Sequence, residues 1–184
     1  MSDYYDTIDI HNVITLKYCT TKQSCFFGVG ALNKFGDILD AEKPNCVGVV
    51  CSRSAYRRCG AWDVIEAALT ERGIEHSMYN KITTNPTTAA IDECTELFRP
   101  KYSHDSFLVC SIGGGSPTDA AKSICCLLEY PGETGRSLYK FKFSPERRAK
   151  LDVVNITSGT GSECDMFAVA IILDEDIPLK PCLA

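Results

Sequence analysis

Residues 111–123 read SIGGGSPTDAAKS, in which three glycines precede a serine, a proline, a carboxylate and a lysine. The apolar residues 106–110 come before this run, and helix-forming residues up to Leu128 follow it. We therefore predict a strand, a glycine turn and a helix with Pro117 in its first turn. The N–H groups and the dipole at the start of such a helix favour a bound phosphate. The turn would consist of Gly113, Gly114, Gly115 and Ser116.

Glycine suits such a turn because it permits close backbone approach and positive φ. The run does not match the G-x-G-x-x-G fingerprint of dinucleotide-binding proteins. Gly28-Val29-Gly30 is a G-x-G without the third glycine, and we interpret it as a turn. A tight strand–helix turn that binds no ligand remains an alternative for residues 113–115.

Two charged side chains follow the glycine turn along the predicted helix. Asp119 lies one turn into it, and a carboxylate beside a pyrophosphate would repel that group. We therefore expect Asp119 to meet a neutral part of a ligand, such as an amide or a hydroxyl. For Lys122, a phosphate contact and a solvated helix lysine remain equally open.

A second loop of small residues, TSGTGSE at 157–163, follows the predicted strand 151–156. It interleaves the hydroxyls of Thr157, Ser158, Thr160 and Ser162 with two glycines. Ser52 and Arg53 follow another predicted strand, and ligands of open α/β sheets bind at the carboxyl ends of strands. Three such loops at one edge favour a dinucleotide, with its pyrophosphate on the glycine turn and its ring and ribose hydroxyls against the second loop.

The elements that must position these loops alternate between short apolar runs and helical patterns. We predict strands over residues 24–27, 46–51, 74–79, 106–112, 151–156 and 167–173. We predict helices over residues 31–41 and 61–72, from Asn85-Pro86-Thr87 onward, and over 117–128, with 137–148 as a linker. This alternation is typical of an α/β fold, a Rossmann-like and mostly parallel sheet flanked by helices, formed by one domain over residues 1–184.

Composition narrows the class of protein. The chain has 184 residues, 45% of them hydrophobic, and a formal net charge of -5, so no basic nucleic-acid footprint is present. No signal peptide and no apolar run of about 18 residues is found, so we expect a cytoplasmic protein without a membrane partner. The eleven cysteines contain no Cys-x-x-Cys pair. We interpret them as reduced, structural thiols rather than a zinc site or a disulfide framework.

Five segments together resemble the N-terminal, nucleotide-binding half of the iron-containing (group III) alcohol dehydrogenases. They are FFGVGAL at 26–32, SAYRRCGAWD at 54–63, NPT at 85–87, IGGGSPTDAAKS at 112–123 and ITSGTGSECDMFAV at 156–169. The resemblance covers about residues 25 to 180. The glycine motif alone also resembles glycerol dehydrogenases and dehydroquinate synthases, an alternative against which SAYRRCGAWD and TSGTGSE argue.

The resemblance implies a two-domain enzyme that interconverts alcohols and aldehydes or ketones. Its first domain would bind NAD(P), and its second, all-helical domain would hold iron or zinc through one Asp and three His. By position, the pyrophosphate would lie on Gly114, Gly115 and Ser116, and the adenosine end near Asn85. Thr157, Ser158 and Thr160 would contact the adenine and ribose side, and Asp119, Ser162 and Phe167 would approach the nicotinamide.

Arg53 bears on the choice of coenzyme. Many NAD-using relatives carry an Asp at this position, where it would bind the ribose 2′-hydroxyl. An arginine attracts a 2′-phosphate instead, with Ser52 beside it, so we predict a preference for NADP, with NAD possible. An Arg53 that is merely exposed is the alternative.

The chain departs from the family where the metal should be. The metal-binding segment lies beyond residue 184 in relatives, and His11, His76 and His104 are scattered. We therefore expect no metal ligands, no catalytic residues and no hydride transfer in this chain by itself. The expected partners are a small-molecule alcohol or aldehyde and either the missing helical domain or further copies of the chain. A stand-alone dinucleotide-binding module without catalysis is the runner-up interpretation.

Overall fold

The structure is a computed structural model that describes residues 13–17, 24–174 and 177–183. The chain divides into two compact units, Met1–Glu42 and Lys43–Ala184. Each unit is described by itself. His11, one of the scattered histidines, lies outside the described residues.

The first unit contains a hairpin followed by a helix. Strands β1 (Ile14–Lys17) and β2 (Ser24–Phe27) pair antiparallel, and helix α1 (Lys34–Glu42) follows a 3-10 turn, η2 (Ala31–Asn33). Gly30 precedes this turn with a φ of 82°, a left-handed conformation that glycine adopts without strain. The predictions of a strand, a glycine turn and a helix here are confirmed, although the helix begins with a 3-10 turn.

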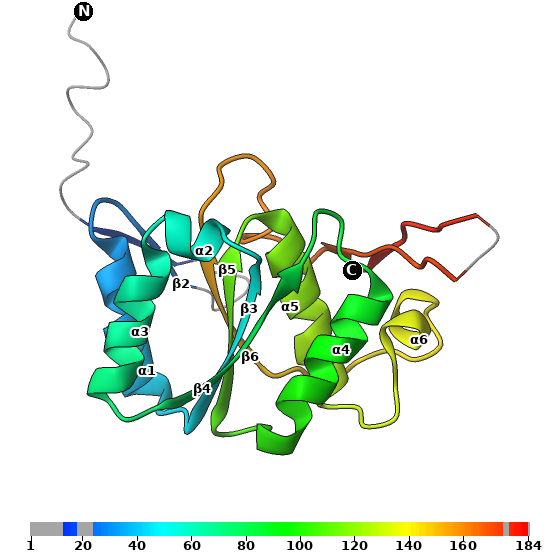
Figure 1. Cartoon of the computed structure of the whole chain (residues 1–184), viewed down its shortest axis with the longest axis horizontal. Coiled ribbons are helices and arrows are strands. Elements are labelled where there is room, and N and C mark those ends of the chain that lie inside the picture. Colours follow the sequence, from blue (N-terminus) through cyan, green and yellow to red (C-terminus); the bar gives the residue numbers. More distant parts are fainter. Residues whose placement is uncertain (1–12, 18–23, 175–176, 184) are drawn as a thin grey trace, which may run out of the picture. The chain divides into compact units, whose positions relative to one another are not determined.

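The second unit is built on a four-stranded parallel sheet with the order β4-β3-β5-β6 (Figure 1). The strands are β3 (Cys46–Ser52), β4 (Glu75–Ile82), β5 (Phe107–Gly113) and β6 (Lys150–Asn155). The central strands β3 and β5 are buried along almost their whole length, as their continuous apolar runs predict. The predicted class, an α/β fold with a Rossmann-like, mostly parallel sheet, is confirmed.

Helices cover both faces of this sheet. Helix α3 (Ala61–Glu71) lies on one face, and α4 (Thr88–Phe98) and α5 (Gly115–Leu128) pack side by side on the other (Figure 1). Two short helices, α2 (Ala55–Arg58) and the 3-10 turn η3 (Arg99–Lys101), were not predicted from the sequence.

The core between α4, α5 and the sheet is tightly packed. Phe98 and Phe107 meet with ring centroids 5.7 Å apart, and Ile124 of α5 is fully buried beside them. Gly48 makes room for these rings, because a β-carbon there would stand 2.7 Å from Phe107 Cζ. Cysteines contribute to the interior as small hydrophobes, as predicted, and Cys46, Cys51, Cys94, Cys110 and Cys125 are buried.

The predicted linker over residues 137–148 is partly wrong, because a short helix, α6 (Gly135–Tyr139), overlaps it. Thr134 and Ser137 form a reciprocal capping box at its start, with Ser137 in the place where Glu or Gln is usual. Leu138 and Tyr139 are buried and fix the helix against α5. The serine variant of the box explains why the pattern is not conspicuous in the sequence.

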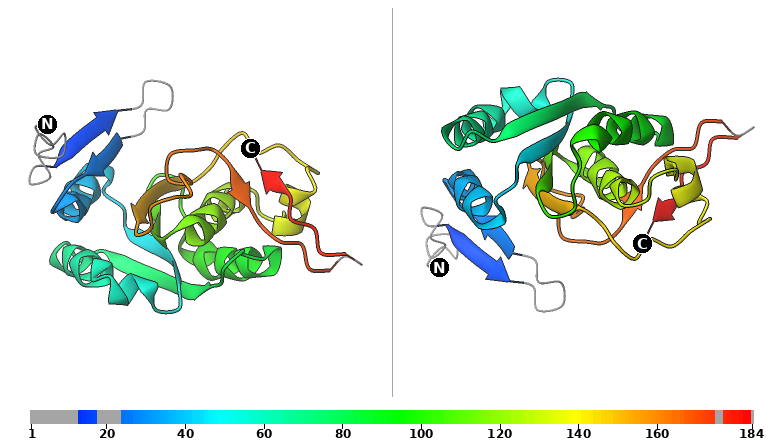
Figure 2. Two further views of the ribbon diagram at one scale, coloured as in Figure 1. Left: turned by 90° about the horizontal axis from the view of Figure 1, so that it is seen from above. Right: turned by 90° about the horizontal axis from the view of Figure 1, so that it is seen from below.

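The predicted strand over residues 167–173 is also wrong in extent and partner. Only Ala168–Val169 forms a strand, β7, and it pairs antiparallel with β8 (Cys182–Leu183) outside the parallel sheet. β8 contacts α6, as Figure 2 shows. Further along, Ile171 bridges to Thr87 instead of continuing β7, while Ala170 and Ile172 pack into the core. The run is apolar because alternate residues face α5 and its neighbours.

Among the described residues, no helix combines the length and the apolar character needed to cross a bilayer.

Candidate functional site

The carboxyl ends of all four parallel strands lie at the upper edge of the sheet in Figure 1. Residues at these ends line one pocket of about 270 Å³. The chain runs from β3 outward to β4 and then returns to the other side of β3 for β5. This reversal of strand order is the point at which open α/β sheets bind ligands. The lining residues are Ser52, Ala55, Ile82, Thr83, Thr84, Gly113, Gly114, Gly115, Ser116, Pro117, Ile156 and Thr157.

The glycine turn forms the junction between β5 and α5. Gly113 is the last residue of β5, Gly114 is the N-cap of α5, and α5 begins at Gly115, two residues before the predicted start. None of the three glycines has a positive φ. Close approach does require them, because a β-carbon would stand 2.4 Å from Pro117 Cγ at Gly113 and 2.4 Å from Thr157 Oγ1 at Gly114.

The first turn of α5 directs main-chain donors toward the pocket. The N–H groups of Gly115 and Ser116 lie where a helix supplies no carbonyl partner, and Pro117 has no N–H. The helix has 14 residues, so its dipole adds partial positive charge at this end. Two hydrogen-bond donors and a positive dipole at the wall of the pocket suit an anionic group such as a phosphate.

Asn85 lies beside this turn. Its main-chain N–H donates to Ser116 Oγ over 3.2 Å, and its side-chain Oδ1 accepts from Lys180 Nζ over 2.7 Å. Its φ of 56° is left-handed, a conformation that asparagine tolerates better than most residues. Two positions further, Thr87 caps α4 by accepting from the N–H of Ala90.

The second small-residue loop packs directly on the glycine turn. Thr157 lies against Gly114, and Thr160 lies against Gly115, where a β-carbon would stand 3.1 Å from Thr160 Cγ2. Thr157, Ser158 and Thr160 are all exposed. The loops that the sequence predicts at one edge of the sheet are therefore in contact there.

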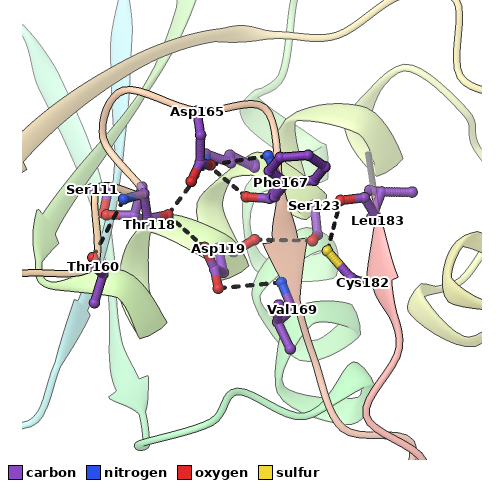
Figure 3. Close-up of polar contacts among 12 residues, drawn as sticks. Ser111, Thr118, Asp119, Ser123, Thr160, Asp165, Phe167, Val169, Cys182 and Leu183 are labelled. Carbon is purple, nitrogen blue, oxygen red and sulfur yellow. Dashed lines mark hydrogen bonds and ion pairs between the residues drawn. The ribbon is translucent and has the colours of Figure 1, made fainter.

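Asp119 binds protein groups in this structure. Its Oδ1 accepts a 2.5 Å hydrogen bond from Ser162 Oγ, and its Oδ2 accepts one of 3.2 Å from the N–H of Val169 (Figure 3). Ser162 is buried and Phe167 is exposed, both on the segment that faces α5. The structure thus brings these three predicted residues together, one turn along α5 from the pocket.

Lys122 is neither solvated nor directed at the pocket. Its Nζ donates to Phe167 O over 2.7 Å, to Asp165 Oδ1 over 2.8 Å and to Ser162 Oγ over 3.2 Å. An ammonium group has three donors, and all three are used here. The interpretation of Lys122 as a solvated helix lysine is wrong, and no donor remains for a phosphate.

Ser52 and Arg53 occupy the carboxyl end of β3. Ser52 lines the pocket, and the exposed Arg53 follows it just before α2. Arg57 of α2 lies 5.5 Å above the ring of Tyr56. No acidic residue is among the described residues that line the pocket, and Arg53 is the neighbour in sequence of the lining residue Ser52.

Sequence reasoning missed two hydroxyl side chains of the pocket, those of Thr83 and Thr84. The predicted strand ended at Tyr79, whereas β4 continues to Ile82, so the two threonines were not placed at a strand end. No alternation marks this extension, because Asn80 and Lys81 are both exposed between the buried Tyr79 and Ile82, where the pairing of β4 with β3 shifts register.

The other described histidines lie away from this pocket. The rings of His76 and Trp62 meet edge to face with centroids 5.3 Å apart, and His104 Nδ1 contacts the carboxylate of Glu129. Among the described residues, no three His, Cys, Asp or Glu side chains gather in a way that could hold a metal ion.

Comparisons with known proteins identify the family of this chain. The family model described as "Iron-containing alcohol dehydrogenase" matches residues 22–180. The long-chain primary alcohol dehydrogenase AdhA of Thermoanaerobacter ethanolicus is 42% identical over 166 residues, which cover 89% of this chain and 40% of that protein. The NADPH-dependent butanol dehydrogenase of Clostridium saccharobutylicum is 27% identical over 165 residues, 90% of this chain and 41% of that protein.

A solved structure shows the same arrangement of elements. The iron-containing alcohol dehydrogenase from Thermotoga maritima superposes with a TM-score of 0.70 and 26% sequence identity, over 83% of this chain and 41% of its own. The chain therefore spans about two fifths of the length of the relatives it matches.

Proposed function

This chain belongs to the iron-containing alcohol dehydrogenase family, and we propose that residues 43–184 bind the dinucleotide coenzyme of such an enzyme. The observation that carries the proposal is the pocket where strand order reverses, with the glycine turn and the first turn of α5 on its wall. A β-carbon at Gly113 or Gly114 would clash with Pro117 or Thr157, so only glycine lets these segments pack closely around the free N–H groups of Gly115 and Ser116. This is the environment that a pyrophosphate needs.

In the proposed complex, each loop has one task. The N–H groups of Gly115 and Ser116 bind the pyrophosphate, together with the bare backbone of Gly113 and Gly114. Asn85 flanks the adenosine end beside Ser116. Thr157, Ser158 and Thr160, on the loop that packs against this turn, contact the adenine and ribose side.

The nicotinamide end is proposed to lie along α5, near Asp119, Ser162 and Phe167. When bound, the nicotinamide supplies the hydride donor or acceptor for an alcohol and its aldehyde or ketone. The protein groups around it bind and orient the ring. Asp119 suits an uncharged part of the coenzyme, because a carboxylate repels phosphate.

We propose that the described residues do not themselves complete a hydride-transfer site. Iron or zinc, the metals that the family implies, would act as a Lewis acid on the alcohol oxygen. The described residues contain no group of ligands for such an ion, so no catalytic step is assigned to them. From family membership, we propose that the whole enzyme interconverts a small-molecule alcohol and its aldehyde or ketone.

We further propose that NADP is preferred over NAD. Arg53 follows β3 at the rim of the pocket, where a bidentate guanidinium would attract a 2′-phosphate. The relative from Clostridium saccharobutylicum, named an NADPH-dependent butanol dehydrogenase, supports this choice. Ser52 adds a hydroxyl beside the arginine.

The proposal is tested by titrating the 184-residue chain with NADP, NADPH and NAD, using calorimetry and thermal unfolding. Ligand at 100 times its dissociation constant should stabilise the chain by about 2.7 kcal/mol, which appears as a raised midpoint. Inorganic pyrophosphate should compete with all three ligands. A chain that unfolds cooperatively, yet shows neither heat of binding nor a raised midpoint with any of them, would contradict the proposal.

A further inference from the structure

We propose that Lys122 and Asp119 are positioning residues that hold loop 156–167 in place as one wall of the coenzyme pocket. This inference rests on the proposed function, because the pocket it concerns is the coenzyme pocket. It differs from any direct role of the two side chains in binding phosphate. We call the set Asp119, Lys122, Ser162 and Asp165 the clasp.

The clasp follows one face of α5. Gly115, Asp119 and Lys122 are spaced i, i+4 and i+7, so they lie in line along the helix. Thr160 packs against Gly115, and Asp119 accepts a hydrogen bond from Ser162. Lys122 donates hydrogen bonds to Asp165 and to the carbonyl of Phe167. The loop is therefore attached to successive turns of the helix between Gly115 and Lys122.

The hydrogen bonds of the clasp form a connected chain. Lys122 Nζ donates to Ser162 Oγ, and Ser162 Oγ donates in turn to Asp119 Oδ1. Asp165 Oδ1 accepts from Lys122 Nζ and from the N–H of Phe167, at 2.8 Å and 3.0 Å. Figure 3 shows the hydrogen bonds by which Asp165 accepts from the N–H of Phe167 and Asp119 accepts from the N–H of Val169.

Lys122 is poorly placed for any other task. Its side chain is only 15% exposed, and its charge is balanced by Asp165, whose side chain is 37% exposed. A largely buried ammonium group needs all of its donors satisfied, and here they are satisfied by the loop alone. Removing it would leave Asp165, Ser162 and the carbonyl of Phe167 without their shared donor.

Few buried side chains fix the conformation of this loop. Residues 157–160 and 164–167 are exposed, and Ser162 is the only buried residue between Thr157 and Phe167. Segments with few buried apolar contacts have low local stability, so a polar clasp has a large effect on them. Ile156 and Thr157 at the start of the loop line the pocket. A loop held in its binding conformation reduces the ordering cost of binding.

The inference predicts that losing Lys122 and losing Arg53 have different effects on coenzyme affinity. Loss of the clasp should weaken the binding of NAD and of NADP to the same degree, by about tenfold or more, because it disturbs a wall of the pocket that both ligands contact. Loss of the Arg53 guanidinium should weaken NADP alone. A direct contact between Lys122 and the 2′-phosphate would also weaken NADP alone.

The test compares the chain with the variants Lys122→Met and Asp165→Asn. Lys101→Met is the matched control, since Lys101 forms an exposed 3.0 Å ion pair with Glu75 and does not line the pocket. Dissociation constants for NAD and NADP are measured by calorimetry. Hydrogen exchange of the coenzyme-free chain is measured at the amides of residues 162–169.

We expect both clasp variants to exchange faster at Phe167 and Val169, with core amides of β5 unchanged, and to lose affinity for both coenzymes. The double variant should be about as weak as Lys122→Met alone, because the two residues act together. Clasp variants with unchanged hydrogen exchange in the loop and unchanged affinity for both coenzymes would overturn the inference. A loss of affinity for NADP alone would also overturn it. If Lys122→Met does not fold, Asp165→Asn decides the question, because it removes only the charge of a partly exposed loop residue.

The two proposals fail separately. A wild-type chain that binds neither coenzyme contradicts the proposed function. In that case the exchange data still show whether Lys122 and Asp165 hold the loop. A chain that binds both coenzymes, with clasp variants that bind them as tightly, contradicts the inference alone.

Discussion

Thr157 lies directly against Gly114, so closely that a β-carbon on Gly114 would stand 2.4 Å from Thr157 Oγ1. This contact joins the end of β6 to the N-cap of α5. The two loops of small residues are thus one packed structure, because the glycines that expose main-chain N–H groups also make room for the threonines. The triple glycine is explained by packing and by the proposed pyrophosphate site together.

Gly114→Ala should therefore harm both stability and binding. The added methyl group overpacks against Thr157, which should cost about 1–3 kcal/mol of unfolding free energy. Coenzyme affinity should fall at least about tenfold, since tenfold corresponds to only about 1.4 kcal/mol. Urea unfolding and calorimetry measure the two effects.

A second change at the same contact provides the control. Thr157→Ala removes Oγ1 and Cγ2, so the double variant Gly114→Ala/Thr157→Ala should regain most of the lost stability. Gly132→Ala, at a glycine with a φ of 96°, should cost stability through backbone strain and leave coenzyme affinity unchanged. Wild-type affinity in Gly114→Ala would show that the ligand does not approach this backbone.

Arg53→Ala should change the choice of coenzyme. A hydrogen bond to a charged group contributes about 1.5–3 kcal/mol, so NADP should bind about tenfold or more weakly while NAD is unaffected. Arg58→Ala, which removes another exposed arginine of the same segment, should have little effect. Parallel titrations with both coenzymes give the ratio, and a wild-type chain that prefers NAD would contradict the prediction.

The buried cysteines should resist alkylation at ordinary pH. Burial raises the pKa of Cys51 to about 12, and burial also raises the pKa of Cys110 and Cys125 well above its usual value. Only the thiolate reacts, so these side chains stay neutral and inert at pH 8 in the folded chain. The exposed Cys59 and Cys182 should be labelled first.

Iodoacetamide labelling followed by peptide mapping measures this order. The buried thiols should react only after urea unfolds the chain. Labelling of Cys51 at the rate of Cys59 under native conditions would be inconsistent with the packing described here.

Glu129 should make the chain sensitive to acid. Burial acts to raise its pKa, but hydrogen bonds from Tyr102 and His104 outweigh that effect, so the pKa of Glu129 is lowered. A carboxyl whose folded pKa lies below its unfolded value adds stability above the unfolded value, about 4.3 for Glu. That stability is lost as the pH falls from about 4.3 through the lower folded value.

Glu129→Gln should therefore lower the unfolding free energy at pH 7, by about 1–3 kcal/mol for a buried charged hydrogen bond, and lose less on acidification. Glu96→Gln is the control, because the side chain of Glu96 is 69% exposed. Urea unfolding at pH 7 and at pH 4 measures both variants. Equal acid sensitivity in wild type and Glu129→Gln would exclude this role.

The parallel sheet and its loops could be predicted because their signals are local. The apolar run of β3 is buried on both faces, and the glycines before α5 mark the turn, so sequence pattern and structure agree there. The same reasoning placed Thr157 and Gly114 at one edge of the sheet. It did not reveal that they touch, since contacts between loops depend on the whole fold.

The predictions are wrong where tertiary contacts determine the conformation or the partner of a residue. Residues 167–173 have the composition of a buried strand, yet Ile171 bridges to Thr87 and only Ala168–Val169 joins a sheet. Lys122 resembles a solvated helix lysine in sequence, and its three acceptors lie 40 to 45 positions further along the chain. Neither result follows from periodicity, because each depends on where a distant loop returns.

The most direct test of the account is an amide NMR titration of the isotope-labelled chain with NADP. We predict that the largest and saturable shifts occur at the N–H groups of Gly114, Gly115 and Ser116, with smaller shifts at Thr157 and Thr160. Saturable binding whose largest shifts fall elsewhere, with those of Gly114–Ser116 unmoved, would contradict the central claim that main-chain donors at the start of α5 bind the coenzyme's pyrophosphate.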